Sequence, residues 1–332
     1  MDSIERVHAI SKRKMPDRLP IWASRHNAKG ILADTAKGMT EREIAFQEAY
    51  DWDMARISPA AALLVEDFGC SFTGNNHLGV PTQLTRPLQS IEDFGKLAFP
   101  DVEGGHYAKI AEAVSGLAEY LQGRKLNLIT AFSPMTLAQK LAGNELVRKG
   151  IEEAPDEFHI LLSRLADFMT DFIRSCIRHG GTGLYFATQS ATYDLLTDEE
   201  FEVFEKPYDL RILQEIREEI DTSILHLHGD RIMIRSFEDY PIDILNWADR
   251  RTVPKVPLKT GAEYFPGGIM GGLNGRTTLC TGTPEDVREE VRQSYRKLGF
   301  PFLISPCCVI PVEGVPEENL RAFREAAEEF TA

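Results

Sequence analysis

Short apolar runs recur along the chain, and segments with a helical pattern separate most of them. The runs comprise Pro20–Ser24, Met54–Ser58, Leu126–Phe132, Gly183–Thr188, Ser223–His228, Ile242–Trp247, Ile269–Leu273 and Phe302–Ser305. Continuous apolar runs of this length are typical of strands that are buried on both faces, as in a parallel sheet covered by helices.

Helix signals lie between these runs. Residues 156–178 carry apolar side chains at three- and four-residue spacing, which predicts an amphipathic helix. Thr197 with Glu200 forms a capping-box pattern, and Thr283 precedes a proline at a predicted first turn. The charged start, residues 1–7, also has a helical pattern.

Eight strand and helix units favour one closed barrel. We predict a single (β/α)8 TIM-type barrel over residues 1–332 with an N-terminal helical extension; a doubly wound open sheet is the alternative. No Gly-x-Gly-x-x-Gly follows an early strand, which argues against a dinucleotide fold. In a barrel, reactive side chains gather at the carboxyl-terminal strand ends.

Composition and charge narrow the function classes. Of 332 residues, 43% are hydrophobic and 27% are charged, and the formal net charge of −14 argues against nucleic-acid binding. No run approaches the roughly 18 apolar residues of a membrane span, and the charged start is unlike a signal peptide. We therefore expect a cytoplasmic protein. Its five cysteines are too few for a disulfide scaffold and are buried thiols, metal ligands or catalytic groups.

His226 and His228 end the fifth predicted strand, and Cys307 and Cys308 follow the last one. Alternate strand residues face one side, so both imidazoles are expected to point into one cavity. With one thiolate, they would form a three-ligand zinc site that keeps a fourth position open. The alternative is one structural histidine, one exposed histidine and two buried thiols.

Several polar residues at strand ends are candidates for substrate binding. Arg25, His26 and Lys29 suit an anionic group such as a carboxylate, although they could equally form a surface loop that pairs with acidic neighbours. Gln189 and Ser190 follow the fourth run and could bind substrate or cap a helix.

Two further candidates follow later strands. Asn246 is expected to line the mouth, with Asp249 or Asp230 orienting an imidazole. Asn274 lies in a glycine-rich segment, which either lets the backbone come close to a ligand or forms a tight turn.

Taken together, these motifs resemble the uroporphyrinogen decarboxylase superfamily, which includes cobalamin-dependent methyltransferases. The resemblance covers nearly the whole chain and rests on the order of residues 20–25, 132–137, 184–190, 196–201, 226–229, 243–247, 271–274, 282–287, 305–308 and 316–320. It implies one TIM-type barrel with a deep cleft at the carboxyl-terminal face. It also allows a homodimer, because decarboxylases of this family are often dimers.

The decarboxylase branch is the weaker match. Arg25 matches its first-strand arginine and Ser190 its serine. Ala60 stands near the position of the aspartate that engages pyrrole nitrogens, Lys140 replaces a tyrosine, and Cys308 replaces a histidine. Without that aspartate, the pyrrole N–H groups have no acceptor.

The methyltransferase branch is closer. It is similar in its zinc-binding His-x-Cys on the fifth strand and cysteine after the last strand, which here correspond to His226, His228 in place of cysteine, and Cys308. The resemblance implies Zn²⁺ and a corrinoid on a separate partner protein. Arg25 would hold a substrate anion and Ser190 would assist. Decarboxylation without metal, or corrinoid or tetrapyrrole binding without catalysis, are the alternatives.

Overall fold

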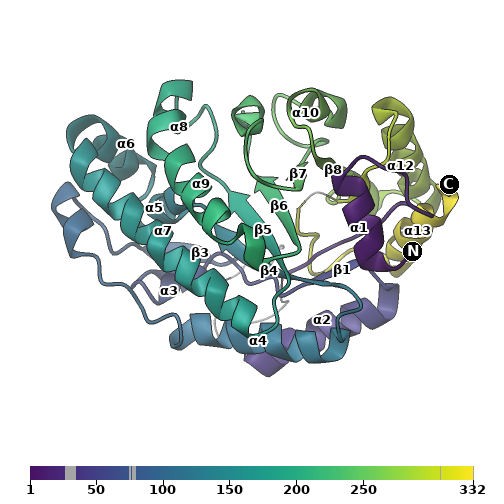
Figure 1. Ribbon diagram of the computed structural model, residues 1–332, viewed down its shortest axis with the longest axis horizontal. Coiled ribbons are helices and arrows are strands. Elements are labelled where there is room, and N and C mark those ends of the chain that lie inside the picture. Colours follow the sequence, from purple (N-terminus) through teal and green to yellow (C-terminus); the bar gives the residue numbers. More distant parts are fainter. Residues whose placement is uncertain (27–34, 75, 77–79, 307, 332) are drawn as a thin grey trace.

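Seven parallel strands form the main sheet of the protein. The computed structural model describes residues 1–26, 35–74, 76, 80–306 and 308–331. The strands lie in the order β1 (Met54–Arg56), β4 (Leu126–Phe132), β5 (Gly183–Thr188), β6 (Thr222–Leu227), β7 (Ile244–Trp247), β8 (Gly268–Gly272) and β9 (Leu303–Ser305). The sheet curls, and helices surround it on the outside (Figure 1). The predicted α/β fold with a parallel sheet is confirmed.

Helices connect most of the strands. They are α2 (Ala36–Tyr50), α3 (Leu63–Glu66), α4 (Gly105–Leu121), α5 (Pro134–Ala142), α6 (Asn144–Glu153), α7 (Pro155–Arg178), α8 (Asp198–Phe204), α9 (Lys206–Glu215), α10 (Leu258–Tyr264), α11 (Thr278–Thr281), α12 (Pro284–Leu298) and α13 (Glu317–Ala326). Every residue of β4, β5, β6, β7 and β8 is buried, as expected for strands covered on both faces.

The predicted helix starts are present. The Thr197 hydroxyl accepts from the Glu200 backbone N–H at 3.2 Å, and the Glu200 carboxylate accepts from the Thr197 N–H at 2.8 Å. Thr283 and Asp286 exchange the same pair of bonds at the start of α12. Two amide groups that the helix leaves unpaired are satisfied at each start.

One of the eight predicted strands, Pro20–Ser24, is not confirmed. Pro20–Ser24 makes one isolated bridge, between Ile21 and Ile304, and forms no regular strand. The segment still contacts both edges of the sheet. Trp22 N donates to Ile304 O at 3.0 Å beside β9, and Asp53 N donates to Ile21 O at 3.0 Å just before β1.

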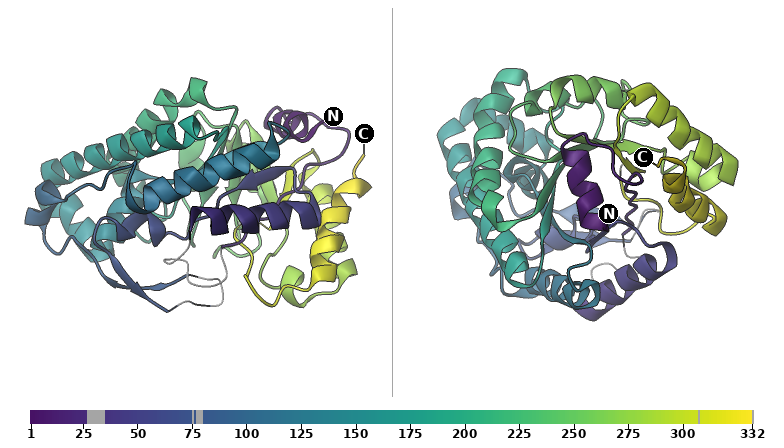
Figure 2. Two further views of the ribbon diagram at one scale, coloured as in Figure 1. Left: turned by 90° about the horizontal axis from the view of Figure 1, so that it is seen from below. Right: turned by 45° about the vertical axis from the view of Figure 1, so that its right-hand side comes forward.

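The N-terminal helix α1 (Ser3–Ser11) lies across one end of the ring of strands (Figure 2). Arg13, which follows it, donates to the Gly267 carbonyl at 2.9 Å, at the start of β8. Arg18 binds the buried Asp53 carboxylate through both terminal nitrogens, at 2.7 and 3.0 Å, just before β1. The amino-terminal strand ends are thus covered, and the opposite ends are left for a site.

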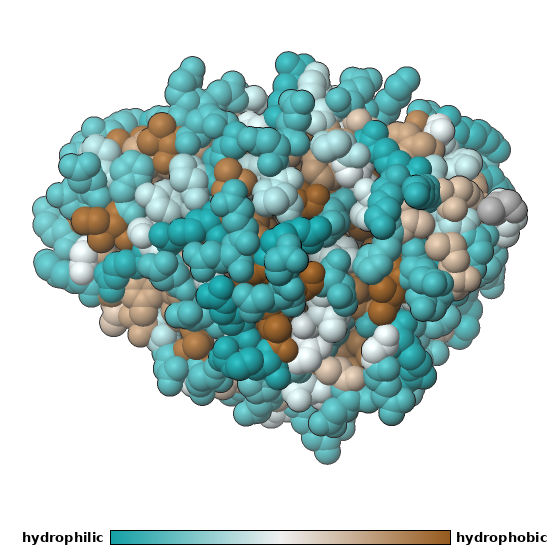
Figure 3. Space-filling view, viewed as in Figure 1, coloured by the Kyte–Doolittle hydropathy of each residue, from teal (hydrophilic) through white to brown (hydrophobic). Residues whose placement is uncertain are grey.

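A short antiparallel hairpin of β2 (Ser71–Thr73) and β3 (Thr82–Thr85) was not predicted. Five of its seven residues are polar and most are exposed, so they give no clear hydrophobic signal. The face seen in Figure 3 is largely hydrophilic with scattered apolar residues. Within the described ranges, no helix has the length and apolar character needed to cross a bilayer.

Candidate metal centre

Three side chains that can bind a metal converge at the carboxyl-terminal ends of the strands. His226 lies near the end of β6, His228 follows that strand, and Cys308 follows β9. Their ligand atoms lie within 4.8 Å of one another, and Cys308 Sγ is 3.8 Å from His228 Nδ1. Among the described residues, this is the one group of three or more His, Cys, Asp or Glu side chains placed to hold an ion.

Asn246 orients His226 from beneath. The Asn246 Nδ2 donates to the Met270 carbonyl at 3.0 Å. Because a carbonyl can only accept, this bond fixes the orientation of the amide, and Asn246 Oδ1 faces His226. His226 Nδ1 lies 2.6 Å from that oxygen and must therefore carry the proton. The Tyr185 hydroxyl donates to the same oxygen at 3.1 Å. His226 Nε2 is left with a free lone pair, the arrangement that metal-binding histidines usually have.

The electrostatics of the cluster favour a thiolate. Burial by itself raises the pKa of the Cys308 thiol, but hydrogen bonds and charge from His226 and His228 outweigh it and hold the pKa well below its usual range. Burial also lowers the pKa of His226, and the hydrogen bond and charge of Cys308 oppose this in part. A thiolate and two neutral imidazoles are ligands that zinc accepts, and three protein ligands leave a fourth position open. The donor set therefore fits Zn²⁺.

The three donors line a cavity of about 330 Å³. Gln189, predicted as a substrate contact, also lines it and accepts a hydrogen bond from Lys140 Nζ at 2.7 Å. Burial lowers the pKa of the Lys140 amine to about 8. Arg276 also lines this cavity. None of the described residues that line the cavity is Asp or Glu.

Arg56 is a cavity residue that the sequence analysis missed. It is the last residue of β1 and is 4% exposed. Its guanidinium carbon lies 4.0 Å from the ring centre of Tyr185 and 5.1 Å from that of Trp22. The available signal was a charged residue inside an apolar run, at a strand end.

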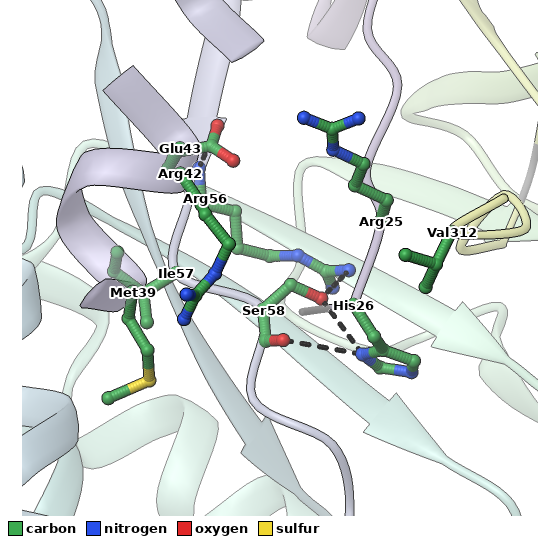
Figure 4. A pocket seen from close by; sticks show the side chains of 9 residues that line it. All are labelled: Arg25, His26, Met39, Arg42, Glu43, Arg56, Ile57, Ser58 and Val312. Carbon is green, nitrogen blue, oxygen red and sulfur yellow. Dashed lines mark hydrogen bonds between the residues drawn. The ribbon is translucent and has the colours of Figure 1, made fainter. Parts of the chain in front are cut away.

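Arg25 and His26 line a second, smaller cavity (Figure 4). His26 lines both cavities, and burial lowers its pKa to about 4. Its Nδ1 is 3.3 Å from the Ser58 carbonyl. Lys29 and Cys307, the other candidates on these segments, lie outside the described residues.

Ser190 does not line the metal cavity. It is fully buried, and its hydroxyl contacts Thr136 Oγ1 at 3.0 Å and donates to Glu205 Oε1 at 2.9 Å. A role in direct contact with substrate is therefore not supported by its position. The buried Glu205 carboxylate, supplied by the junction of α8 and α9, draws the side chain inward.

Two other predicted contacts also lie away from the cavity lining. Asn246 is completely buried and binds His226 instead of facing the mouth. Asn274 Oδ1 accepts from the backbone N–H groups of Arg276 and Thr277, which is the tight-turn alternative. Asp249, one of the two expected partners of an imidazole, accepts from Gly272 N at 3.1 Å.

A curled parallel α/β sheet, with side chains that could hold a metal at its carboxyl-terminal strand ends, is the arrangement typical of TIM-type barrel enzymes. The chain belongs to the uroporphyrinogen decarboxylase (URO-D) family, whose pattern matches residues 2–330. The resemblance seen in the sequence motifs is thereby confirmed.

Named relatives of the chain include enzymes of methyl transfer and uroporphyrinogen decarboxylases, one of which, from Prochlorococcus marinus, is 21% identical over 96% of this chain and 96% of the relative. The methylcobamide:CoM methyltransferase MtbA of Methanosarcina acetivorans is 25% identical, over 98% of this chain and 97% of the relative. A methylated-thiol–coenzyme M methyltransferase of Methanosarcina mazei is 24% identical, over 93% of this chain and 79% of the relative. A solved methyltransferase from Methanosarcina mazei shares the fold, with a TM-score of 0.85, 18% identity and 99% of both chains covered.

Proposed function

We propose that this enzyme is a zinc-dependent methyltransferase that moves a methyl group between a small substrate and a corrinoid on a separate partner protein. The substrate is a thiol or a methylated heteroatom. The observation that carries the proposal is the convergence of His226, His228 and Cys308 within 4.8 Å in a cavity at the strand ends. Relatives named for methylcobamide and methylated-thiol chemistry support it.

His226, His228 and Cys308 would hold the metal. Zinc bound there acts as a Lewis acid that lowers the pKa of a bound thiol, so that a thiolate exists near neutral pH. In methyl transfer to a thiol, the sulfur loses its proton and gains the methyl group, and the partner's corrinoid keeps the bonding electron pair. In the reverse direction, the methyl group would pass to the reduced corrinoid of the partner, which would supply the electron pair of the new bond, and the substrate heteroatom would keep the pair of the broken bond.

The residues around the donors have supporting roles. Asn246 fixes the tautomer of His226 through the 2.6 Å bond to Nδ1. Gln189, Lys140 and His26 line the cavity and would contact the substrate, and Arg25 lines the adjoining smaller cavity. Ser190 is better placed as a positioning residue, because its bonds hold the end of β5, where the Thr188 carbonyl accepts from His228 N at 3.0 Å.

The decarboxylase alternative has less support. A pyrrole N–H needs an acceptor, and no Asp or Glu lies among the described residues that line the metal cavity. Ala60, near the position where the decarboxylase branch carries its aspartate, is a buried alanine.

Metal content tests the proposal. Protein purified under reducing conditions without chelators should contain about one zinc per chain by elemental mass spectrometry. The changes His226→Ala, His228→Ala and Cys308→Ala should each remove it. Cys176→Ala is a matched control, because Cys176 is a fully buried thiol in α7. Cys307→Ala should also retain the metal; if it alone lost zinc, Cys307 would replace Cys308 as the third ligand.

Activity is then measured with methylcobalamin and thiols, by the absorbance change on demethylation. Zinc-loaded protein should demethylate methylcobalamin only when a thiol is present, and the Cys308→Ala variant should not. Wild-type protein without zinc would refute the three-ligand site. Zinc-loaded protein that binds a corrinoid tightly but never turns over would favour the non-catalytic binding alternative.

A further inference from the structure

The metal cavity offers few groups that can accept the proton of a substrate thiol. In the proposed transfer to a thiol, the sulfur must lose this proton before it takes the methyl group. No Asp or Glu lies among the described residues that line the cavity. Its arginines, Arg56 and Arg276, hold their protons throughout the physiological range and cannot act as bases. The acceptor within the protein must therefore be a histidine or a lysine.

The three histidines of the cavity are poor acceptors. His226 and His228 would use their lone pairs to bind the metal. His26 places Nδ1 3.3 Å from the Ser58 carbonyl (Figure 4), so the lone pair of a neutral ring is on Nε2. Burial, and to a smaller extent the charge of Arg56, lower the pKa of His26 to about 4. A base this weak takes the proton of a neutral thiol poorly.

Lys140 is the remaining nitrogen base of the cavity. It lies on α5, is partly buried, and donates from Nζ to Gln189 Oε1 at 2.7 Å. Its amine lies 5.4 Å from the ring centre of Phe132, and no carboxylate among the described residues pairs with it. One bond to a neutral amide and one aromatic neighbour stabilise an ammonium ion only weakly, so the amine can release its proton and take up another.

Gln189 holds this amine in place. The Thr136 hydroxyl, one helical turn before Lys140 on α5, accepts from Gln189 N at 2.8 Å. The residue before Gln189 is Thr188, whose carbonyl accepts from His228 N at 3.0 Å. The end of β5 therefore joins the lysine on one side to the strand end that carries a candidate metal ligand on the other.

The surroundings of Lys140 favour the neutral amine. Two ionisable side chains act on it: Arg86, which follows β3, and Cys70, which precedes β2. Burial raises the pKa of the Cys70 thiol to about 11, so it carries no charge near neutral pH. Burial, with a smaller contribution from Arg86, lowers the pKa of Lys140 to about 8. General bases are most effective when their pKa lies near the working pH.

We propose that Lys140 is the general base of the site, which takes the proton of the substrate thiol while Gln189 positions its amine. This inference rests on the proposed function and adds a catalytic residue to it. The S–H bond breaks, its electron pair stays on sulfur, and the proton joins the lone pair of Nζ. The ammonium ion then releases the proton to water. In the reverse direction, it gives a proton to the departing thiolate.

Proton release on thiol binding tests this step without methyl transfer. Zinc-loaded protein is titrated with 2-mercaptoethanol at pH 8.5, in two buffers of different ionisation enthalpy, so that calorimetry counts the protons that reach the buffer. About three quarters of Lys140 is neutral at this pH and can take the proton, so the wild type should release about 0.3 proton per bound thiol. Lys140→Met should release about one.

A second variant separates a base from a fixed positive charge. Lys140→Arg keeps the charge but cannot take up a proton, so it should also release about one proton per thiol. It keeps the test decisive if Lys140→Met fails to fold. Lys149→Met is the matched control, because this exposed lysine of α6 pairs with Glu145 at 3.1 Å. It should release as few protons as the wild type, and all three variants should retain zinc.

The acidity of the thiol gives the kinetic readout. Lys140→Met and Lys140→Arg should each lower kcat/KM for 2-mercaptoethanol about 100-fold, the usual effect of losing a general base. For 2,2,2-trifluoroethanethiol, the loss should be below about 10-fold, because an acidic thiol gives up its proton with less help. A lysine that only held the substrate would affect both thiols equally, and Lys140→Arg would restore part of the rate.

The outcomes separate this proposal from the proposed function. Equal proton release by the wild type and both Lys140 variants, or an equal loss of rate with the two thiols, would overturn the role of Lys140. A zinc-loaded wild type that binds no thiol would overturn both proposals. If the proton passes to Lys140 as expected but methylcobalamin is not demethylated, the proposed function fails and thiol activation by Lys140 stands.

Discussion

The buried Glu205 side chain lowers the free energy of unfolding as the pH rises, and one substitution should remove this effect. The side chain is fully buried, and its Oε1 accepts from the hydroxyls of Thr188 and Ser190. Its Oε2 and the Oδ1 of Asp209, four residues along, are both buried without a hydrogen-bond partner among the described residues. Residues four apart on a helix are neighbours, so the two carboxyl groups face similar surroundings.

The magnitude follows from the pKa. Burial raises the pKa of Glu205 from 4.5 to about 7, and burial with the nearby Glu205 charge raises that of Asp209 well above its usual range. Between pH 4.5 and 7 the unfolded state has lost the Glu205 proton and the folded state has kept it. The free energy of unfolding therefore falls as the pH rises through this range, by about 3 kcal/mol in all, and the cost is complete above pH 7.

Glu205→Gln should abolish this contribution. The amide oxygen can still accept from Thr188 and Ser190, and the amide does not titrate in this pH range. Urea unfolding, followed by circular dichroism at several pH values, should show little difference from wild type near pH 4.5. The variant should become more stable than wild type by about 3 kcal/mol at pH 8.

The control is Glu199→Gln, an exposed carboxylate in the first turn of α8, which should change stability by less than about 0.5 kcal/mol at any pH. A stability difference between Glu205→Gln and wild type that stays constant from pH 4.5 to 8 would refute the reasoning. It would mean that the Glu205 carboxyl does not change protonation between the folded and unfolded states.

Three further predictions test the site and the fold. Asn246→Ala should lower zinc affinity about 10- to 100-fold in competition with a chelator, because the proton of the bound imidazole loses its acceptor; unchanged affinity would contradict the tautomer argument. Arg18→Ala should cost about 3–5 kcal/mol in urea unfolding, since it leaves the buried Asp53 carboxylate without its main partner; a loss below about 1 kcal/mol would contradict this. After chelator treatment, iodoacetamide should alkylate Cys308 before Cys176, whose pKa is raised by burial, with the order read by peptide mass spectrometry.

The strands and helices were predictable where burial leaves a simple pattern. Strands such as β4 and β5 are buried on both faces and read as continuous apolar runs. The hairpin of β2 and β3 was missed because its polar residues face solvent. Pro20–Ser24 was apolar enough to predict a strand, but its single hydrogen bonds to the sheet edges form only one isolated bridge.

The candidate site was predictable only in part, for a related reason. The two-residue spacing of His226 and His228 on a strand end is a local feature, so their shared direction could be inferred. The surroundings depend on residues distant in sequence. Ser190 turns inward toward Glu205, and Asn246 turns toward His226, and no local pattern reveals either partner. Arg56 was hidden for the opposite reason, because a charge within an apolar run resembles an interruption of the strand.

The candidate metal centre and the cations around its cavity are linked through charge. Zinc with one thiolate and two neutral imidazoles carries a net charge of +1, one unit more positive than a site with a second thiolate. The cavity adds the cations Arg56, Lys140 and Arg276, and no carboxylate among its described lining residues offsets them. A neutral substrate would leave this positive charge uncompensated in a partly buried space. A thiolate bound to the metal would supply one negative charge, so His228 in place of a second thiolate and the buried guanidinium of Arg56 would both favour a substrate that binds as an anion.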